Sequence, residues 1–239
     1  GGVSGVSPNP TFVRPSDPRK TFNVPRPGSN FTTCTANTGV FTASDGTTLL
    51  MPAYGNDVGQ TRYVAWMFRS TDGGLTWTVG STIADHGPTG TRQYEEPGCL
   101  RRPGTATVYC LLRVDNDPPS GVDPNRGTVF FVTSLDDGAT WSAPVAVFQG
   151  RGTTPLVLLT NGTLVAMNRS RGTGVYGATE GFRGEIWYST DSGVTWSNYG
   201  DVTNPLDGPD DMRGGPYMGA GLLEVRPNVV GAIWGQETA

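Results

Sequence analysis

The chain of 239 residues is long enough to bury a sizeable core, and its 36% hydrophobic and 10% aromatic residues are sufficient to fill one. Its 17 basic and 21 acidic residues are well mixed and give a net charge of -4, which argues against a nucleic-acid partner. No run approaches the roughly 18 apolar residues of a membrane helix, and no signal peptide is visible at residues 1–10.

Cysteine and histidine are too few and too scattered to favour metal chemistry. The chain has three cysteines, Cys34, Cys99 and Cys110, without a Cys-x-x-Cys spacing, and one histidine, His86. This set does not support a zinc site or a histidine-based nucleophile relay, so we expect no metal and no cofactor. Cys99 and Cys110 flank a turn, and they either pair across a hairpin or remain two buried free thiols.

The predicted elements are a short arm followed by repeated pairs of hairpins. Residues 1–28, rich in Pro, Ser and Arg, are expected to form an extended arm, and residues 29–239 the folded domain. Alternating apolar runs joined by turn residues predict one hairpin and then a second in each of three units. The first hairpins cover 41–54, 98–113 and 155–169, and the second cover 61–83, 127–148 and 184–202. Two more strands flank "RPN" within 215–236, so about three and a half four-stranded units are predicted.

The turn of each second hairpin carries the same pattern, Ser-x-Asp-x-Gly-x-Thr-Trp, which we call the box. It occurs as "STDGGLTW" at 70–77, "SLDDGATW" at 134–141 and "STDSGVTW" at 189–196. In a tight turn the Asp carboxylate can accept bonds from backbone N–H groups, Gly can supply a positive φ, and Trp can bury its ring. Three copies at one place in each unit cannot converge on one substrate, so we interpret Asp72, Asp136 and Asp191 as structural.

Repeated four-stranded antiparallel units favour a β-propeller, because each unit buries both faces only against its neighbours. Propellers usually have about four to eight blades. We therefore expect this chain to be part of a longer one, the alternative being that the N-terminal arm supplies the missing strands.

The boxes resemble the Asp-box (bacterial neuraminidase) repeats of the sialidase superfamily. Segments between the boxes are similar to that family in the same order, over roughly residues 37–235: they are 37–55, 95–113, 182–196 and 214–234. The resemblance implies a six-bladed propeller when complete, which removes terminal sialic acid with retention of configuration. It also implies a sialylated glycan or other carbohydrate as partner, and a secreted or cell-surface location. Oligomeric state is left open.

The resemblance assigns roles to four residues. Tyr217 would be the nucleophile and Glu96 the carboxylate that takes its proton, while Arg113 and Arg183 would bind the carboxylate of sialic acid. A guanidinium offers planar, bidentate donors to a carboxylate, which lysine does not. Because the substrate is anionic beside its reacting carbon, a neutral Tyr avoids the repulsion that a carboxylate nucleophile would meet.

Each assignment has an alternative. Glu95 rivals Glu96, Arg113 could pair with Asp115 or Asp117, and Arg183 has counterparts before other strands. Tyr217 could be a rim aromatic, since Met218 follows it where the family usually has Ser.

The family's first arginine and its general-acid Asp have no match within residues 1–36, and Asp57 is the nearest acid to test. We therefore expect the chain alone to be inactive. Two other functions stay open: a non-catalytic carbohydrate-binding or structural propeller, and an exo-glycosidase of the superfamily acting on another sugar.

Overall fold

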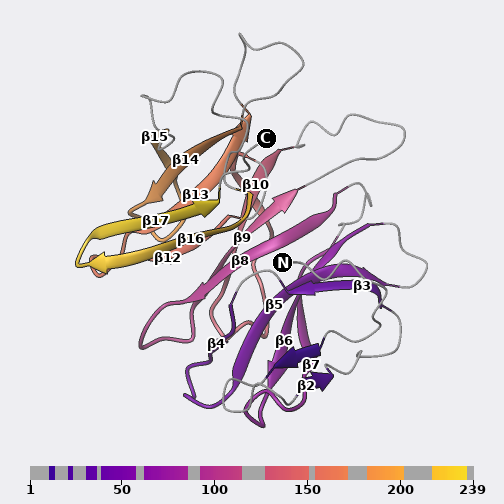
Figure 1. Cartoon of the computed structure of the whole chain (residues 1–239). Coiled ribbons are helices and arrows are strands. Elements are labelled where there is room, and N and C mark those ends of the chain that lie inside the picture. The colour runs from indigo at the N-terminus through magenta and orange to yellow at the C-terminus, as the bar shows by residue number, and fades with distance from the viewer. Residues whose placement is uncertain are drawn as a thin grey trace.

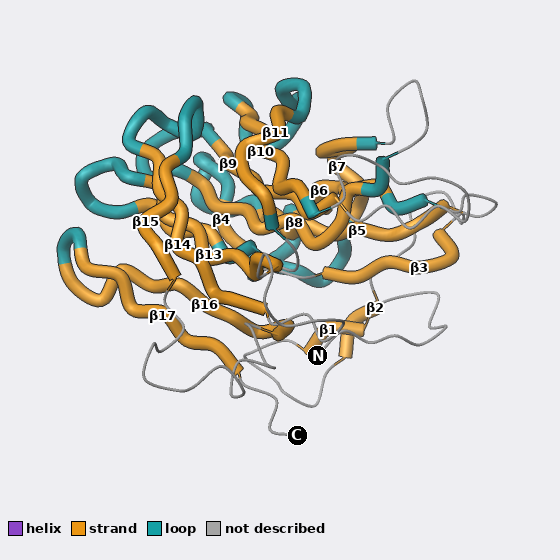
Figure 2. Tube along the Cα trace, turned by 90° about the horizontal axis from the view of Figure 1, so that it is seen from above, coloured by secondary structure: helices purple, strands orange, loops and turns teal. Residues whose placement is uncertain are grey.

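The described part of this computed structural model consists of strands and turns. It comprises residues 11–13, 21–23, 31–36, 39–57, 62–85, 92–114, 127–150, 154–171, 182–201 and 217–235, and no helix occurs among them (Figures 1 and 2). The strands are β1 (Thr11–Val13), β2 (Thr21–Asn23), β3 (Phe31–Ala36), β4 (Phe41–Thr42), β5 (Leu49–Asp57), β6 (Val64–Ser70), β7 (Thr78–Ala84), β8 (Tyr94–Arg101), β9 (Val108–Val114), β10 (Thr128–Ser134), β11 (Val145–Gln149), β12 (Leu156–Leu158), β13 (Leu164–Arg171), β14 (Phe182–Ser189), β15 (Ser197–Asp201), β16 (Tyr217–Arg226) and β17 (Val229–Gly235). The all-β prediction is therefore confirmed.

The strands form successive antiparallel blades. Blade 1 has the order β3-β5-β6-β7 with β4 also on β5, blade 2 is β8-β9-β10-β11, blade 3 is β12-β13-β14-β15, and β16-β17 form the first hairpin of blade 4. Strand β8 packs against β5 and β12, and β12 packs against β16, so the blades follow one another along an arc (Figure 2). The prediction of two hairpins per unit is confirmed. These sheets are consistent with part of a propeller.

A further small sheet, β1-β2, lies in the segment for which an extended arm is predicted. The domain boundary at residue 28 stays a prediction. In the described ranges there is also no helix with the length and apolar character needed to cross a membrane.

The core lies between neighbouring blades, and β9 shows why. Side chains alternate between the two faces of a strand. Val108, Cys110 and Leu112 pack in one hydrophobic cluster with blade 1, whereas Tyr109 and Leu111 pack in another with blade 3. Because both faces of blade 2 are covered, its two central strands, β9 and β10, are mostly apolar and buried rather than alternating with polar residues.

The three box turns have the same hydrogen-bond pattern. In the first box, the Ser70 hydroxyl donates to Asp72 Oδ1 at 2.7 Å, and the Gly74 N–H donates to Ser70 Oγ at 2.9 Å. The Thr76 N–H donates to Asp72 Oδ1 at 2.9 Å and its hydroxyl to Oδ2 at 2.6 Å. The other two boxes repeat these four bonds around Asp136 and Asp191. The prediction that these aspartates hold the turns is confirmed.

The second box also bonds to the blade before it. Ser44, in the first hairpin of blade 1, donates its backbone N–H to Asp137 Oδ1 at 2.9 Å and its hydroxyl to Oδ2. The Arg69 guanidinium donates to the Asp137 carbonyl. Trp141 donates its indole N–H to Ser81 of β7 at 3.0 Å, whereas the box tryptophans of blades 1 and 3 donate to glycine carbonyls within their own turns. Residues 137–141 therefore join blade 2 to blade 1.

Replacing Asp191 with Asn should lower the melting temperature at neutral pH, and the deficit should shrink in acid. Hydrogen bonds from the Thr195 hydroxyl, the Thr195 backbone and Ser189 lower the pKa of Asp191 from 3.8 to about 2. A lowered pKa gives stability that is present above the unfolded value and is lost as the pH falls through the folded value. Circular-dichroism melts across this acid range measure the difference between wild type and variant, and a constant difference would contradict the prediction.

Cys99 and Cys110 form a disulfide, which settles the alternative left open by the sequence. They are directly opposite each other on β8 and β9, with Cα atoms 4.1 Å apart, as in a non-hydrogen-bonded antiparallel pair. The disulfide therefore joins the two strands that carry Glu96 and Arg113.

Candidate active site

The candidate site begins at a bulge in β8. Glu95 pairs with Arg113 of β9 and Gly98 pairs with Leu111, so Glu96 and Pro97 lie opposite a single β9 residue. Glu96 has a φ of +47°, a left-handed conformation that is uncommon for residues other than glycine. Proline lacks the N–H that a regular ladder needs, and bulges re-aim side chains near functional sites. The sequence "EEPG" therefore turns two consecutive glutamates towards one arginine.

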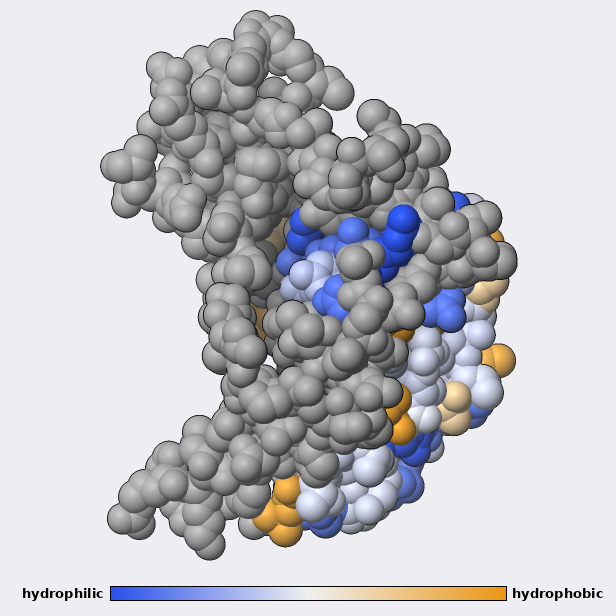
Figure 3. Space-filling model, turned by 90° about the vertical axis from the view of Figure 1, so that its right-hand side faces the viewer, coloured by the Kyte–Doolittle hydropathy of each residue, from blue (hydrophilic) through white to orange (hydrophobic). Residues whose placement is uncertain are grey.

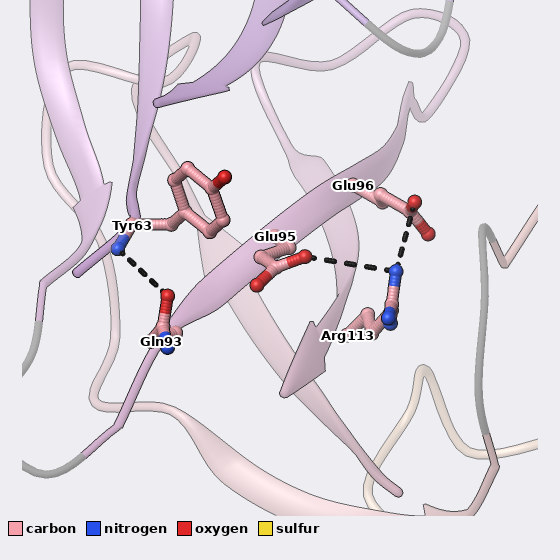
Figure 4. Close-up of polar contacts among 5 residues, drawn as sticks. All are labelled: Tyr63, Gln93, Glu95, Glu96 and Arg113. Atoms are coloured by element: carbon pink, nitrogen blue, oxygen red, sulfur yellow. Dashed lines mark hydrogen bonds and ion pairs between the residues drawn. The ribbon is translucent and has the colours of Figure 1, made fainter. Parts of the chain in front are cut away.

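Both carboxylates are buried and share that arginine. Glu95 and Glu96 are only 6% and 4% exposed. Arg113 Nη1 lies 2.9 Å from Glu96 Oε1, with a hydrogen bond between them, and 3.6 Å from Glu95 Oε2 (Figure 4). Buried charges persist in proteins when they are paired, and removing one partner of such a pair is strongly destabilising. We call these three residues the Glu–Glu–Arg triad; in their charged forms they carry a net charge of -1.

Two tyrosines of blade 1 lie next to this triad. Tyr54 of β5 and Tyr63, just before β6, contact edge to face with ring centroids 5.5 Å apart. The Tyr63 carbonyl accepts a bond from the Tyr94 N–H at 3.2 Å, and the Tyr63 N–H donates to the Gln93 side chain at 3.4 Å (Figure 4). Burial and the charges of Glu96 and Glu95 raise the pKa of Tyr54 well above its usual value, with Arg113 opposing them. The Tyr54 phenol is therefore held in its protonated form.

A buried asparagine lies where blade 3 meets the outer strand of blade 2. Asn168 of β13 is fully buried, and its Nδ2 donates to the Gln149 carbonyl at 3.1 Å. A Cβ at Gly150 would lie 1.2 Å from Asn168 Nδ2, so only glycine permits this approach. Within the described part of the chain, Asn168 Oδ1 has no hydrogen-bond partner. Asn168 begins the segment "NRS" at 168–170, which fits a weak glycan-acceptor pattern, but it was not among the predicted site residues.

The predicted site residues fall into two groups. The structure brings Glu96 and Arg113 together, and it pairs Arg113 with glutamates; the alternative partners, Asp115 and Asp117, lie outside the described residues. The backbone of Arg183 pairs with Ser170 near the end of β13, and that of Tyr217 begins β16. The side chains of Arg183, Tyr217 and Asp57 lie outside the described part, so their convergence with the triad stays a prediction.

The sequence drew attention to the residues of the triad but not to the two tyrosines. Glu96 and Arg113 lie at the open end of one hairpin, whereas Tyr54 and Tyr63 reach the site from another blade. Tyr54 lies in segment 37–55, which resembles the family, but the resemblance gave it no role. The surface of the described residues in Figure 3 is mostly hydrophilic or neutral, and its hydrophobic residues are few and separate. Surface hydropathy therefore adds no second candidate site on that face.

Comparison with known proteins identifies the fold. No protein-family model and no curated protein matches the chain. Solved structures do match: the Hadza microbial sialidase Hz136 has a TM-score of 0.60 and 20% identity, over 84% of this chain and 42% of that one. An α-L-arabinofuranosidase of Fusarium graminearum in complex with arabinobiose has a TM-score of 0.63 and 13% identity, over 97% and 69%. The Trypanosoma rangeli sialidase has a TM-score of 0.57 and 14% identity, over 96% and 36%.

This chain thus spans 42% of the first sialidase and 36% of the second, so it corresponds to part of those proteins. The neighbours are glycoside hydrolases built on one propeller, and identities of this size establish architecture alone. The repeated antiparallel blades, the box turns and these structural neighbours all indicate the same architecture. The chain therefore has the fold of the sialidase-like β-propeller superfamily.

Proposed function

We propose that the chain forms part of the active site of an exo-α-sialidase-like glycoside hydrolase, which removes a terminal sialic acid through a tyrosyl intermediate. The observation that carries the proposal is Glu96, a buried carboxylate in a left-handed backbone conformation, hydrogen-bonded to Arg113. Strained non-glycine backbone is concentrated at functional sites.

In this proposal Glu96 accepts the proton of the Tyr217 hydroxyl as it attacks the anomeric carbon. A lone tyrosine is almost wholly protonated at neutral pH, so an adjacent base is needed. The glycosidic bond breaks in this step, and the leaving alcohol takes a proton from a general acid of the full-length protein. Water then attacks the anomeric carbon and gives a proton to the conjugate base of that acid, so that the sugar is released with retained configuration while Glu96 returns the first proton to Tyr217. Arg113 and Arg183 bind the substrate carboxylate. The reaction uses side chains only and requires no cofactor.

A second candidate is an exo-glycosidase that acts on a neutral sugar. The observation that favours it is that Nη1 of Arg113 already lies near two carboxylates, which gives the triad a net negative charge and opposes an anionic ligand there. The α-L-arabinofuranosidase of Fusarium graminearum, 69% of which this chain covers, has a structure in complex with arabinobiose. An arabinofuranosyl unit is therefore the alternative sugar to test.

We also propose that the protein acts outside the cytoplasm, in secreted or cell-surface form. The Cys99–Cys110 disulfide supports this location, since disulfides persist mainly in oxidising compartments.

The proposal is tested in the full-length protein with fluorogenic glycosides of N-acetylneuraminic acid and of L-arabinofuranose. Wild type should hydrolyse the sialoside, and Tyr217→Phe should lose turnover by about 10²-fold or more, because the nucleophilic oxygen is absent. Equal turnover by both proteins would contradict the nucleophile assignment. Hydrolysis of the arabinofuranoside alone would establish the second candidate. A folded protein that hydrolyses neither would contradict both candidates.

A further inference from the structure

The turn of the β12–β13 hairpin carries an exposed asparagine, Asn161, at the start of the segment "NGT". Its Oδ1 accepts a hydrogen bond from the Thr163 N–H at 3.0 Å, which is an Asx-turn, the bond of an asparagine side chain to the backbone two residues on. Within the described residues its Nδ2 has no hydrogen-bond partner. A Cβ at Gly162 would meet no atom within 4 Å, so the space beside the turn is open. The amide nitrogen of Asn161 is therefore able to carry a substituent.

Contacts with blade 4 hold this turn without using that nitrogen. The backbone N–H of Asn161 donates to Asn228 Oδ1 at 3.1 Å. The N–H and the hydroxyl of Thr160 each donate to the Glu224 carboxylate at 2.9 Å. A group attached to Asn161 Nδ2 can therefore project into solvent while every one of these bonds between blades 3 and 4 is kept.

The segment "NRS" at 168–170 has the same pattern in the opposite setting. Asn168 is fully buried, and its Nδ2 donates to the Gln149 carbonyl at 3.1 Å. A Cβ at Gly150 would lie 1.2 Å from this nitrogen, so the site lacks room for even a methyl group. A sugar on Asn168 would break the bond to Gln149 and force β13 away from blade 2. A third such segment, "NFT" at 30–32, begins at a residue outside the described part.

We propose that Asn161 is an N-glycosylation site and that Asn168 is not. Asn-x-Ser/Thr segments that accept N-linked glycans are surface features of secreted proteins, because the glycan is bulky and hydrophilic. The inference goes beyond the proposed glycosidase. It rests only on the extracellular location, which the Cys99–Cys110 disulfide supports.

The modification is a group transfer from an oligosaccharide that is joined to a lipid through a diphosphate. Asn161 Nδ2 displaces the diphosphate from the anomeric carbon of the first sugar. A carbon–nitrogen bond forms, the bond from carbon to the diphosphate oxygen breaks, and the amide gives one proton to the transferase. The lipid diphosphate is the leaving group, so the protein itself supplies only the acceptor.

The glycan is remote from the proposed active site. Strands β9 and β13 each begin opposite the serine of the box in their own blade. Asn161 precedes β13 and lies at the box end of blade 3, whereas Arg113 lies at the other end of β9. Loss of the glycan should therefore leave kcat and KM unchanged.

Peptide mapping of the full-length protein, secreted from a eukaryotic host, tests the proposal. Peptide-N-glycosidase in heavy-oxygen water converts each glycosylated asparagine into a labelled aspartate, which mass spectrometry locates. The label should appear at Asn161 and not at Asn168. Asn161→Gln removes the acceptor nitrogen, and Thr163→Ala removes the hydroxyl of the pattern while leaving the backbone N–H that bonds to Asn161, so both variants should lose this glycan. Thr163→Ser is the matched control, and it should keep the glycan.

An unlabelled Asn161 in the secreted and folded protein would overturn the inference, and so would a label at Asn168. The result is independent of the proposed function. A label at Asn161 in a protein that hydrolyses neither glycoside would support the inference although the glycosidase proposal fails. An active enzyme with an unlabelled Asn161 would leave the glycosidase proposal in place and reject the inference.

Discussion

Glu96→Gln in the full-length protein should lower kcat by about 10²- to 10⁴-fold, the usual contribution of a positioned general base. The amide keeps the shape of the side chain, and its oxygen can still accept the bond from Arg113, so the β8 bulge should be retained. What is lost is the ability to take the Tyr217 proton. Steady-state kinetics with the substrate identified for wild type measure the change, and a melting curve verifies that the variant is folded.

Glu95→Gln is the matched control, because it alters the neighbouring carboxylate that is nearly as buried and contacts the same arginine. It should lower kcat much less than Glu96→Gln does, since Glu95 is not the proposed base and lies farther from Arg113, at 3.6 Å against 2.9 Å. If Glu95→Gln instead causes the larger loss of kcat, the roles of the two glutamates must be exchanged. If neither variant alters kcat, the triad is structural.

Gly98→Ala should destabilise the protein by about 1–3 kcal/mol, the usual cost of adding a methyl group to a closely packed site. A Cβ at this position would lie 2.0 Å from the carbonyl oxygen of Thr154. The obstacle is backbone, which cannot rotate away as a long side chain would, so β8 must move from the segment that enters β12. Chemical denaturation monitored by tryptophan fluorescence measures the change in the free energy of unfolding.

Substitutions at two other glycines distinguish a steric clash from backbone strain as the cause of such a loss of stability. A Cβ added at Gly39 would have no neighbouring atom within 4 Å, and Gly39 has no positive φ. Gly39→Ala should therefore leave stability unchanged or raise it slightly. Gly104→Ala also has open space but a φ of +72°, so it reports backbone strain alone. A Gly98→Ala protein that is as stable as Gly39→Ala would show that the close approach of β8 to Thr154 does not exist in solution.

The blades could be predicted from the sequence because their signals are local. Strand positions follow from alternation and from turn residues such as the "SDGTT" and "TNGT" segments, and the box repeats identify the second hairpin of each unit. The bulge at Glu96 could not be predicted in the same way. A bulge is a mismatch of register between β8 and β9, and only Pro97 hinted that the ladder is interrupted.

The candidate site was predictable only within a single hairpin. Glu96 and Arg113 lie at the same end of β8 and β9, so a hairpin with its turn at 102–107 places them together. Tyr54 and Asn168 belong to other blades, and their positions depend on how the sheets pack face to face. That packing is set by many apolar contacts, none of which leaves a short motif in the sequence.

The bonds between blade 1 and the second box have a consequence for how the protein unfolds. Between blades 1 and 2, hydrogen bonds join Ser44, Arg69 and Ser81 to the second box at Asp137, Gly138 and Trp141. Between blades 3 and 4, the Thr160 N–H donates to the Glu224 carboxylate. Each blade thus completes its own hydrogen bonding with groups of another. Where stability depends on nearest-neighbour interfaces, a weakened repeat lowers the stability of the repeats beside it. Fraying of one blade therefore exposes the polar groups of its neighbour, which makes the arc a cooperative unit rather than a row of separate sheets.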